Sequence, residues 1–408
     1  MKRLFILLLA LLCMEPAFAC TSMIISAKAS ATGKPVMYKH RDAGELNNRI
    51  ERFKGPKYEF IGLVNSPKKG GEVWTGTNSA GFGIMNTASY NIKDDNVPDS
   101  QMDQEGVVMY KALGQCATLA DFEHLLDILP RPMGVEANFG VIDAQGGAAY
   151  YEVNNHKWIK YDVNAEPSGY RVVTNFSFSG RPADAQGVER YETASAIMKE
   201  LTSAGAPYSI GHKEIVNSFS RSYRHERLGI DLIDDLPANG MFVDQDFIPR
   251  RSTAASIVIE GVAPGENPLH TVMWTLIGHP ACGVMMPLMV GQKDIVPSYF
   301  KRSEKSRNCE ACDVAMSLKT KYVFDNNIGN GKHYFHADVI LNGTEGRPSL
   351  LQCARETEVY IDTAFDYIFS KWVRSEMSDA EFFEKYAFIS SSFLDVYRSK
   401  FVSYLNFD

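Results

Sequence analysis

The sequence predicts an α+β fold, with β-hairpins in its first half and helices toward its end. Apolar runs begin near Cys20 and at Val36, and the turn-forming segment Thr32–Pro35 separates them, which is typical of a hairpin. A second hairpin is predicted at Asn138–Val153, where two adjacent glycines fall in the turn. Apolar and aromatic residues at helical spacing recur beyond residue 341, which predicts C-terminal helices.

Residues 1–19 have the three parts of a secretory signal. Lys2 and Arg3 give a positive start, Leu4–Leu12 is apolar without a break, and Ala17-Phe18-Ala19 is a small-x-small cleavage pattern. The apolar run is shorter than the ~20 residues that a membrane span needs. We therefore expect cleavage after Ala19, export to the periplasm or the medium, and a mature chain without a membrane span.

The charge and the cysteine pattern of the sequence argue against nucleic-acid and metal ligands. The chain has 408 residues and a formal net charge of −7, and a mildly acidic protein is a poor candidate for nucleic-acid binding. Cys309 and Cys312 form a lone Cys-x-x-Cys without a second pair or clustered histidines. This pattern favours a local disulfide or a chance pair over a zinc site or a redox centre. No metal or organic cofactor is expected.

Cys20 would become the first residue of the mature chain, and three interpretations compete for it. A lipid-anchored envelope protein also begins with cysteine, and the chain would then be a non-catalytic binding protein. Lipoprotein signals usually carry leucine three residues before that cysteine, where this chain has Ala17, and a small residue where it has Phe18. Export also permits a disulfide at Cys20. The third interpretation is a nucleophile.

An N-terminal cysteine carries its own base. Its α-amino group titrates near pKa ~7.7–8.0, so it can accept a proton close to neutral pH. A thiolate is a strong nucleophile, and an adjacent N-terminal amine can activate a nucleophile without a histidine. Cleavage after Ala19 would then uncover the nucleophile and create its base in one event.

The second strand of the first hairpin ends in a cluster of charge, Lys39, His40, Arg41 and Asp42. A hairpin returns this cluster to the start of its partner strand, beside Cys20. A cation there would favour the thiolate, and a carboxylate could orient the amine. The alternative is that the cluster is a solvated loop.

Two asparagines end strand-like runs. Asn86 follows a glycine-rich run inside Gly76–Asn91, and Asn175 follows Val172 and Val173. An asparagine amide can donate a hydrogen bond to an oxyanion, although asparagines also commonly serve turns. A helix that carries Arg190 is predicted at Asp184–Ala204.

The order of these segments resembles one superfamily. They resemble the N-terminal-nucleophile hydrolases of the choloylglycine hydrolase and penicillin acyltransferase (acyl-coenzyme A:6-aminopenicillanate acyltransferase) type. The match rests on Cys20-Thr21, KHRD, NSAGFGIMN, NFGVIDAQGGAAYYEV and VVTN, with a looser similarity at Thr271–Leu288. The resemblance implies a four-layer αββα sandwich of two antiparallel sheets over residues 20–340. Residues 341–408 would add C-terminal helices that cover the sandwich or build a contact between subunits.

The resemblance also implies roles for five residues. Cys20 would be the nucleophile and its amine the general base. Asp42 matches the aspartate that holds the amine, and Asn86 matches the oxyanion-hole asparagine. Asn175 matches the asparagine that positions substrate and nucleophile, and Arg190 matches a late arginine that supports the site.

The cation beside the thiolate stays open between two residues. Lys39 stands where the family carries arginine, and Arg41 is an alternative donor. Lysine and arginine are not equivalent at a site that needs two parallel hydrogen bonds. The activity implied is hydrolysis or transfer of the acyl group of a linear non-peptide amide, through a thioester on Cys20. Bile-salt amides, N-acyl amino acids, acyl-homoserine lactones, penicillins and peptides remain alternatives for the substrate.

Several elements outside the motifs are also predicted. Helices are expected at Ala117–Leu129, Leu351–Val373 and Ser378–Phe401, the first and last with capping-box starts. Thr271–Leu288 is expected to hold a late strand pair. His279 lacks a partner motif, so a core or loop position is expected rather than catalysis.

Overall fold

The computed structural model describes residues 19–68, 70–244, 246–291, 293–324 and 334–405. The predicted leader therefore lies, apart from Ala19, outside the described residues. Within them, no helix is long and apolar enough to cross a membrane.

The first sheet has six strands in the order β10-β1-β2-β14-β15-β16, and every neighbouring pair is antiparallel. Its strands are β1 (Cys20–Ile25), β2 (Val36–Asp42), β10 (Tyr170–Val173), β14 (Thr253–Glu260), β15 (Val272–Ile277) and β16 (Met286–Leu288). The predicted hairpin at the start of the chain is confirmed as β1 and β2, and the late strand pair as β15 and β16.

The second sheet has seven strands that pair in sequence order, again all antiparallel. They are β3 (Asn48–Lys54), β4 (Glu59–Asn65), β5 (Thr75–Asn78), β6 (Gly83–Ala88), β7 (Ala137–Ile142), β8 (Ala148–Val153) and β9 (Trp158–Asp162). β7 and β8 are the predicted second hairpin. Gly146 takes a φ of 83° in its turn, a conformation that favours glycine.

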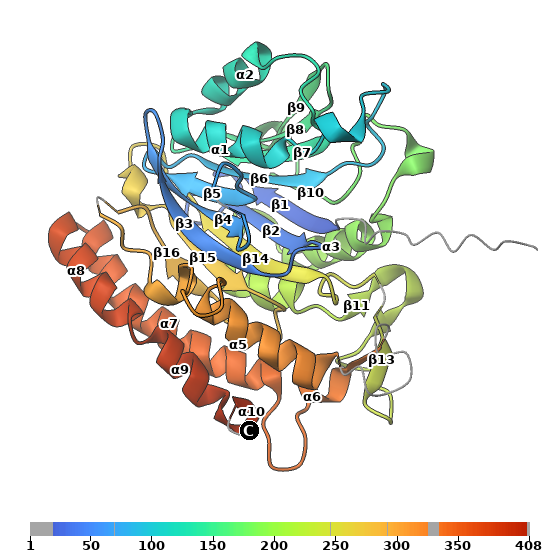
Figure 1. The fold of residues 1–408 in the computed structure, drawn as a ribbon, viewed down its shortest axis with the longest axis vertical. Coiled ribbons are helices and arrows are strands. Elements are labelled where there is room, and N and C mark those ends of the chain that lie inside the picture. Colours follow the sequence, from blue (N-terminus) through green and yellow to red (C-terminus); the bar gives the residue numbers. More distant parts are fainter. Residues whose placement is uncertain (1–18, 69, 245, 292, 325–333, 406–408) are drawn as a thin grey trace, which may run out of the picture.

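The helices flank the sheets in two groups (Figure 1). They are α1 (Glu105–Gln115), α2 (Leu119–Ile128), α3 (Val188–Leu201), α4 (His212–Ile215), α5 (Glu310–Leu318), α6 (Ala337–Leu341), α7 (Leu350–Val373), α8 (Asp379–Ser390), α9 (Phe393–Lys400) and α10 (Val402–Leu405). Two short strand pairs lie outside the sheets, β11 (Arg224–His225) with β12 (Ile230–Asp231) and β13 (Met241–Val243) with β17 (Tyr334–His336).

The predicted helices are found with three differences. α2 begins with the expected capping box of Thr118 and Asp121. The helix predicted from Ser378 to Phe401 is wrong as one element, because it breaks into α8 and α9 around Ser391 and Ser392. Their hydroxyls bond the carbonyl oxygens three residues back, which competes with helical hydrogen bonding. The helix of Arg190 begins only at Val188, and α1, α4, α5, α6 and α10 were not predicted.

Alternation along the strands of the first sheet divides the apolar side chains between two cores. Ile24 and Met37 pack between the sheets, with Met85 from β6. Met23 and Tyr38 point the other way and pack under α3, α7 and α8. A third core joins the outer face of the seven-stranded sheet to α1 and α2. The predicted four-layer αββα arrangement is confirmed.

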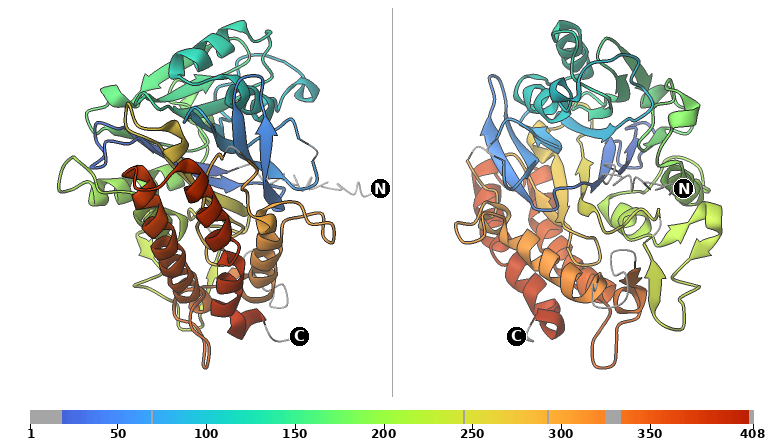
Figure 2. Two further views of the ribbon diagram at one scale, coloured as in Figure 1. Left: turned by 90° about the vertical axis from the view of Figure 1, so that its left-hand side faces the viewer. Right: turned by 45° about the vertical axis from the view of Figure 1, so that its right-hand side comes forward.

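The C-terminal helices lie on the side away from α1 and α2, as the two views of Figure 2 show. One buried ion pair ties α7 to the sheet. Arg221, whose side chain is fully buried, bonds both carboxylate oxygens of Glu358 at 2.8 and 2.7 Å. Glu358 also accepts the N–H of Met285. Arg221 further donates to the carbonyl oxygens of Pro280 and Gly283, which precede β16.

A second contact on α7 is a histidine between two carboxylates. His212 stacks on Trp274 at 3.5 Å between ring centroids, and its ring nitrogens lie 3.0 Å from Glu260 and 3.3 Å from Asp362. Burial acts to lower the pKa of His212. Hydrogen bonds and charge from Asp362 and Glu260 outweigh it and raise that pKa to about 9.

The described cysteines are all free and buried, so the local disulfide anticipated for Cys309 and Cys312 is not formed. The Cys309 thiol donates to the carbonyl of Asn48, and that of Cys312 to the carbonyl of Leu46. His279 is buried, in agreement with the predicted core position.

We predict that Glu358→Gln lowers the free energy of unfolding by about 3 kcal/mol, because it leaves the Arg221 guanidinium buried without a counter-charge. The measurement is urea denaturation. Glu356→Gln on the same helix is the matched control. Glu356 forms an exposed ion pair with Lys400, so its replacement should lower the free energy of unfolding by less than about 1 kcal/mol. Equal losses in the two variants would contradict this account.

We predict a pH-dependent contribution from His212. Because the folded pKa is raised above the unfolded value near 6.5, the stabilisation is fully present below pH 6.5. It is lost as the pH rises through about 9, and amounts to about 3 kcal/mol at most. Stability curves of wild type and His212→Gln should therefore converge between these pH values. Parallel curves would refute the assignment.

Candidate active site

Cys20 is the first residue of β1, held between β10 and β2 and opposite Arg41 in the β1–β2 ladder. Cys20 is buried, with 6% of its surface exposed. It lines a cavity of about 640 Å³ together with Lys39, Arg41 and Asn86. A larger surface hollow of about 810 Å³ beside α5 contains none of the predicted site residues.

The pleat explains which predicted residues meet. Side chains two apart on a strand share a face, so Lys39 and Arg41 lie on the face of the sheet that carries Cys20. That face meets β6, from which Asn86 projects. Thr21, His40 and Asp42 have the other parity. The cluster at the end of β2 is therefore divided between two faces, and all of it is buried rather than a solvated loop.

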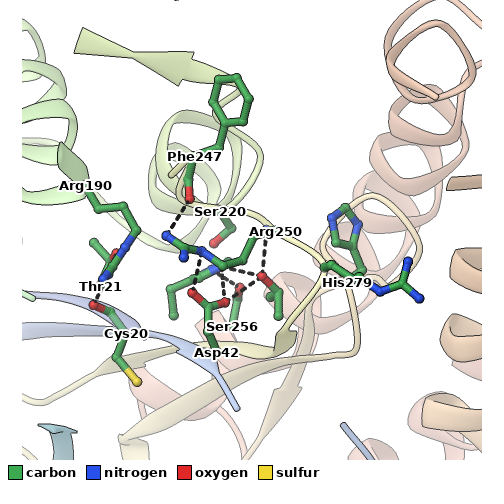
Figure 3. A network of polar contacts seen from close by, with 12 residues as sticks. Cys20, Thr21, Asp42, Arg190, Ser220, Phe247, Arg250, Ser256 and His279 are labelled. Carbon is green, nitrogen blue, oxygen red and sulfur yellow. Dashed lines mark hydrogen bonds and ion pairs between the residues drawn. The ribbon is translucent and has the colours of Figure 1, made fainter. Parts of the chain in front are cut away.

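Asn175 and Arg190 hold the backbone of Cys20. In the uncleaved chain, the N–H of Cys20 donates to Oδ1 of Asn175 at 2.7 Å. Arg190 donates to the same Oδ1 at 2.9 Å. It also donates to the carbonyl oxygen of Cys20 and to the hydroxyl of Thr21 (Figure 3). The amide nitrogen of Asn175 donates to the carbonyl of Ala88 at 2.9 Å. One guanidinium thus fixes both the nucleophile's backbone and the amide that contacts it.

Lys39 has two hydrogen-bond acceptors inside the cavity wall. Its Nζ donates to Oδ1 of Asn86 at 2.6 Å and to the carbonyl of Trp74 at 2.7 Å. Burial lowers the pKa of Lys39 to about 7. The thiolate of Cys20 opposes this shift and the charge of Arg41 adds to it. The charge of Lys39 therefore titrates close to neutral pH.

Arg41 is held by neutral partners. It donates to Oδ1 of Asn48 at 2.9 Å and of Asn65 at 3.0 Å, and its guanidinium lies 5.1 Å from the ring centroid of Trp74. Burial lowers the pKa of Arg41 to about 10, and the charge of Cys20 acts against that shift. Arg41 thus stays charged at neutral pH. The sequence left open whether Lys39 or Arg41 is the cation beside the thiol. In the structure both line the cavity of Cys20, and they differ in pKa, about 7 for Lys39 and about 10 for Arg41.

Asp42 is buried, but among the described residues its carboxylate forms no hydrogen bond or ion pair with Cys20. It accepts from the hydroxyl of Thr253 at 2.7 Å and lies 3.2 Å from Nε of Arg250. In Figure 3 the sulfur of Cys20 points away from this pair. Burial raises the pKa of Asp42 to about 6, against the opposing charge of Arg250. Its backbone N–H donates to the carbonyl of Ala19 at 2.8 Å, so Asp42 adjoins the predicted cleavage point. Its role in holding the amine stays a prediction.

Sequence reasoning missed several residues at the site. Trp74 and Tyr90 line the cavity, and Trp74 supplies the carbonyl that binds Lys39. Tyr90 lies inside the glycine-rich segment already singled out. Arg250 and Thr253 carry no motif, because they reach Asp42 only through the pairing of β14 with β2. No cluster of side chains suited to a metal is found among the described residues.

The chain is similar, at low sequence identity, to a number of solved structures that include the following three. A Caenorhabditis elegans N-acylethanolamine-hydrolyzing acid amidase ortholog is 16% identical, with a TM-score of 0.41, and the match covers 61% of this chain and 93% of that one. Penicillin V acylase from Agrobacterium tumefaciens is 12% identical, with a TM-score of 0.39 and coverages of 67% and 87%. A mutant conjugated bile acid hydrolase from Clostridium perfringens is 11% identical, with a TM-score of 0.38 and coverages of 67% and 93%. No family model and no curated protein matches.

We predict that Arg190→Lys lowers the free energy of unfolding by about 2 to 3 kcal/mol, because a lysine cannot reproduce the three-way fork to Asn175, Cys20 and Thr21. Amide hydrogen exchange at residues 21 and 22 should accelerate in parallel. Arg227→Lys is the control. Arg227 pairs with Glu189 and Glu192 on the exposed side of α3, so its replacement should have little effect on the free energy of unfolding.

Proposed function

We propose that the chain is an exported N-terminal-cysteine amidohydrolase or acyltransferase that acts on linear non-peptide amides. The observation that carries the proposal is the placement of Cys20 at the head of β1, in a cavity with two buried cations and the Asn86 amide. Removal of residues 1–19 would free the amine beside this thiol. The similar solved structures include an acid amidase ortholog, a penicillin V acylase and a conjugated bile acid hydrolase.

The first chemical step is attack by Cys20. Its α-amine accepts the thiol proton, and Asn175 is placed to hold that amine through Oδ1. Sulfur then bonds the carbonyl carbon of the substrate amide, and an oxyanion develops on the carbonyl oxygen. Lys39 and Arg41 stabilise the thiolate that precedes attack.

Collapse of the tetrahedral intermediate breaks the carbon–nitrogen bond. The protonated α-amine returns its proton to the leaving amine, and the acyl group remains on Cys20 as a thioester. Water, or an acceptor amine in a transferase, attacks the thioester and releases the acyl product with the free thiol. Asn86 lines the cavity and supplies an amide donor for the oxyanion of both steps.

Asp42 adjoins the new N-terminus. While residue 19 is attached, the N–H of Asp42 bonds the carbonyl of Ala19, and cleavage would remove that acceptor. One oxygen of the Asp42 carboxylate is buried without a hydrogen-bond donor among the described residues, although Nε of Arg250 lies close. We assign Asp42 to the ammonium form of the mature Cys20 amine, which would offer it a donor.

We predict that the mature protein begins with Cys20 as a free amine, measured by intact-protein and N-terminal mass spectrometry. Cys20→Ala should abolish hydrolysis of a panel of N-acyl amino acids, a bile-salt amide and a penicillin. Asn86→Ala should lower kcat about 100- to 1000-fold. Cys353→Ala, which removes a buried cysteine from α7, should leave the rate unchanged.

Two results would overturn the proposal. A diacylglyceryl group on Cys20 would block the amine and favour the lipid-anchored binding protein. A free Cys20 that hydrolyses nothing on the panel, and is alkylated by iodoacetamide no faster than an ordinary thiol, would remove the catalytic assignment.

A further inference from the structure

The amide of Asn86 can point either way in its plane, and Lys39 decides which. The Nζ of Lys39 lies 2.6 Å from Oδ1 of Asn86 and 2.7 Å from the carbonyl oxygen of Trp74. An ammonium group has three N–H donors and no acceptor. A flipped amide would set the two donors of its NH₂ group against those of Lys39. The amide oxygen therefore faces Lys39 whenever the lysine is protonated, which is the favoured form below a pH of about 7.

The nitrogen of Asn86 then lies on the opposite side of the amide. Asn86 lines the same cavity as Cys20, and among the described residues no acceptor is bonded to its Nδ2. An unengaged N–H donor in the wall of the nucleophile's cavity suits an oxygen that gains negative charge during the reaction.

Lys39 is itself fixed. Its residue is 3% exposed, and the backbone carbonyl of Trp74 holds its Nζ independently of Asn86. Arg41, the other cation at the thiol, is bonded instead to Asn48, Asn65 and the carbonyl of Glu45. Both cations act on Cys20, but only Lys39 also holds the Asn86 amide.

We propose that Lys39 is a positioning residue, which locks the amide of Asn86 so that Nδ2 donates to the oxyanion. This inference rests on the proposed function, since it assigns a task within that reaction. Without Lys39 the amide can rotate about its terminal torsion and present Oδ1 to the oxyanion, which would repel it. A lysine ammonium is a compact donor group, unlike the forked guanidinium of an arginine, and at position 39 it is directed at the single oxygen Oδ1 of Asn86.

The test compares two reactions of the mature enzyme. Alkylation of Cys20 by iodoacetamide needs the thiolate but develops no oxyanion, whereas hydrolysis of an N-acyl amino acid needs both. Lys39→Met should lower kcat for hydrolysis about 10- to 100-fold more than it lowers the alkylation rate, with KM little changed. Arg41→Met should slow both reactions by a similar factor.

Three further variants sharpen the result. Lys39→Arg, which restores a donor, should recover part of the hydrolysis without a matching change in alkylation. In an Asn86→Ala background, Lys39→Met should cause no additional loss beyond its effect on alkylation. Lys319→Met is the matched control, because Lys319 is also buried and donates to a backbone carbonyl, of Arg251, outside the cavity. It should retain both reactions.

The inference and the proposed function fail differently. Equal losses in hydrolysis and alkylation for Lys39→Met, or full additivity with Asn86→Ala, would overturn the positioning role while leaving the enzyme intact. Absence of any hydrolysis in a wild type with a free Cys20 would overturn both. Urea denaturation of each variant shows that it is folded. Methionine is chosen because its side chain has a shape similar to the aliphatic part of lysine. It carries no charge, so the substitution leaves no unpaired ion at the buried position.

Discussion

The pairing of β1 between β10 and β2 is the constraint on which the site depends. It fixes Cys20 opposite Arg41 and places the carbonyl oxygen of Cys20 against Arg190. It also brings the end of β10 close enough for Asn175 to accept the N–H of Cys20. Because side chains alternate along a strand, a slip of one residue would turn Lys39 and Arg41 away from the cavity. The nucleophile is positioned by backbone register before any side-chain contact is considered.

The hydrogen-bond partners of Lys39 and Arg41 explain how these buried cations can stabilise a thiolate at Cys20. Arg41 and Lys39 are bonded to the side-chain amide oxygens of Asn48, Asn65 and Asn86. In the described part of the chain, neither cation forms an ion pair with a carboxylate. Neutral amides satisfy the N–H donors of a cation but do not cancel its charge. The net positive potential therefore remains available to a thiolate at Cys20, at the cost of desolvating two cations.

The C-terminal helices are part of the same packing problem. Ile361 of α7 belongs to the core between the sheets and C-terminal elements, whereas Phe365 and Trp372 belong to the core under the six-stranded sheet. The Arg221–Glu358 pair and the His212 contact hold that helix against the loops before β16 and against β14. The His212 contact thereby supports β14, which pairs with β2, and the Arg221–Glu358 pair supports the segment before β16.

The sequence alone determined the hairpin of β1 and β2, the hairpin of β7 and β8, and the candidates at the site, because turn chemistry, alternation and charge at strand ends are local signals. It did not determine which face each member of the Lys39–Asp42 cluster occupies, nor the partners of Lys39 and Asp42. Asn86 lies 47 residues beyond Lys39 and Thr253 lies 211 beyond Asp42. Such contacts arise only when the two sheets stack and β14 pairs with β2, so the tertiary structure decided them.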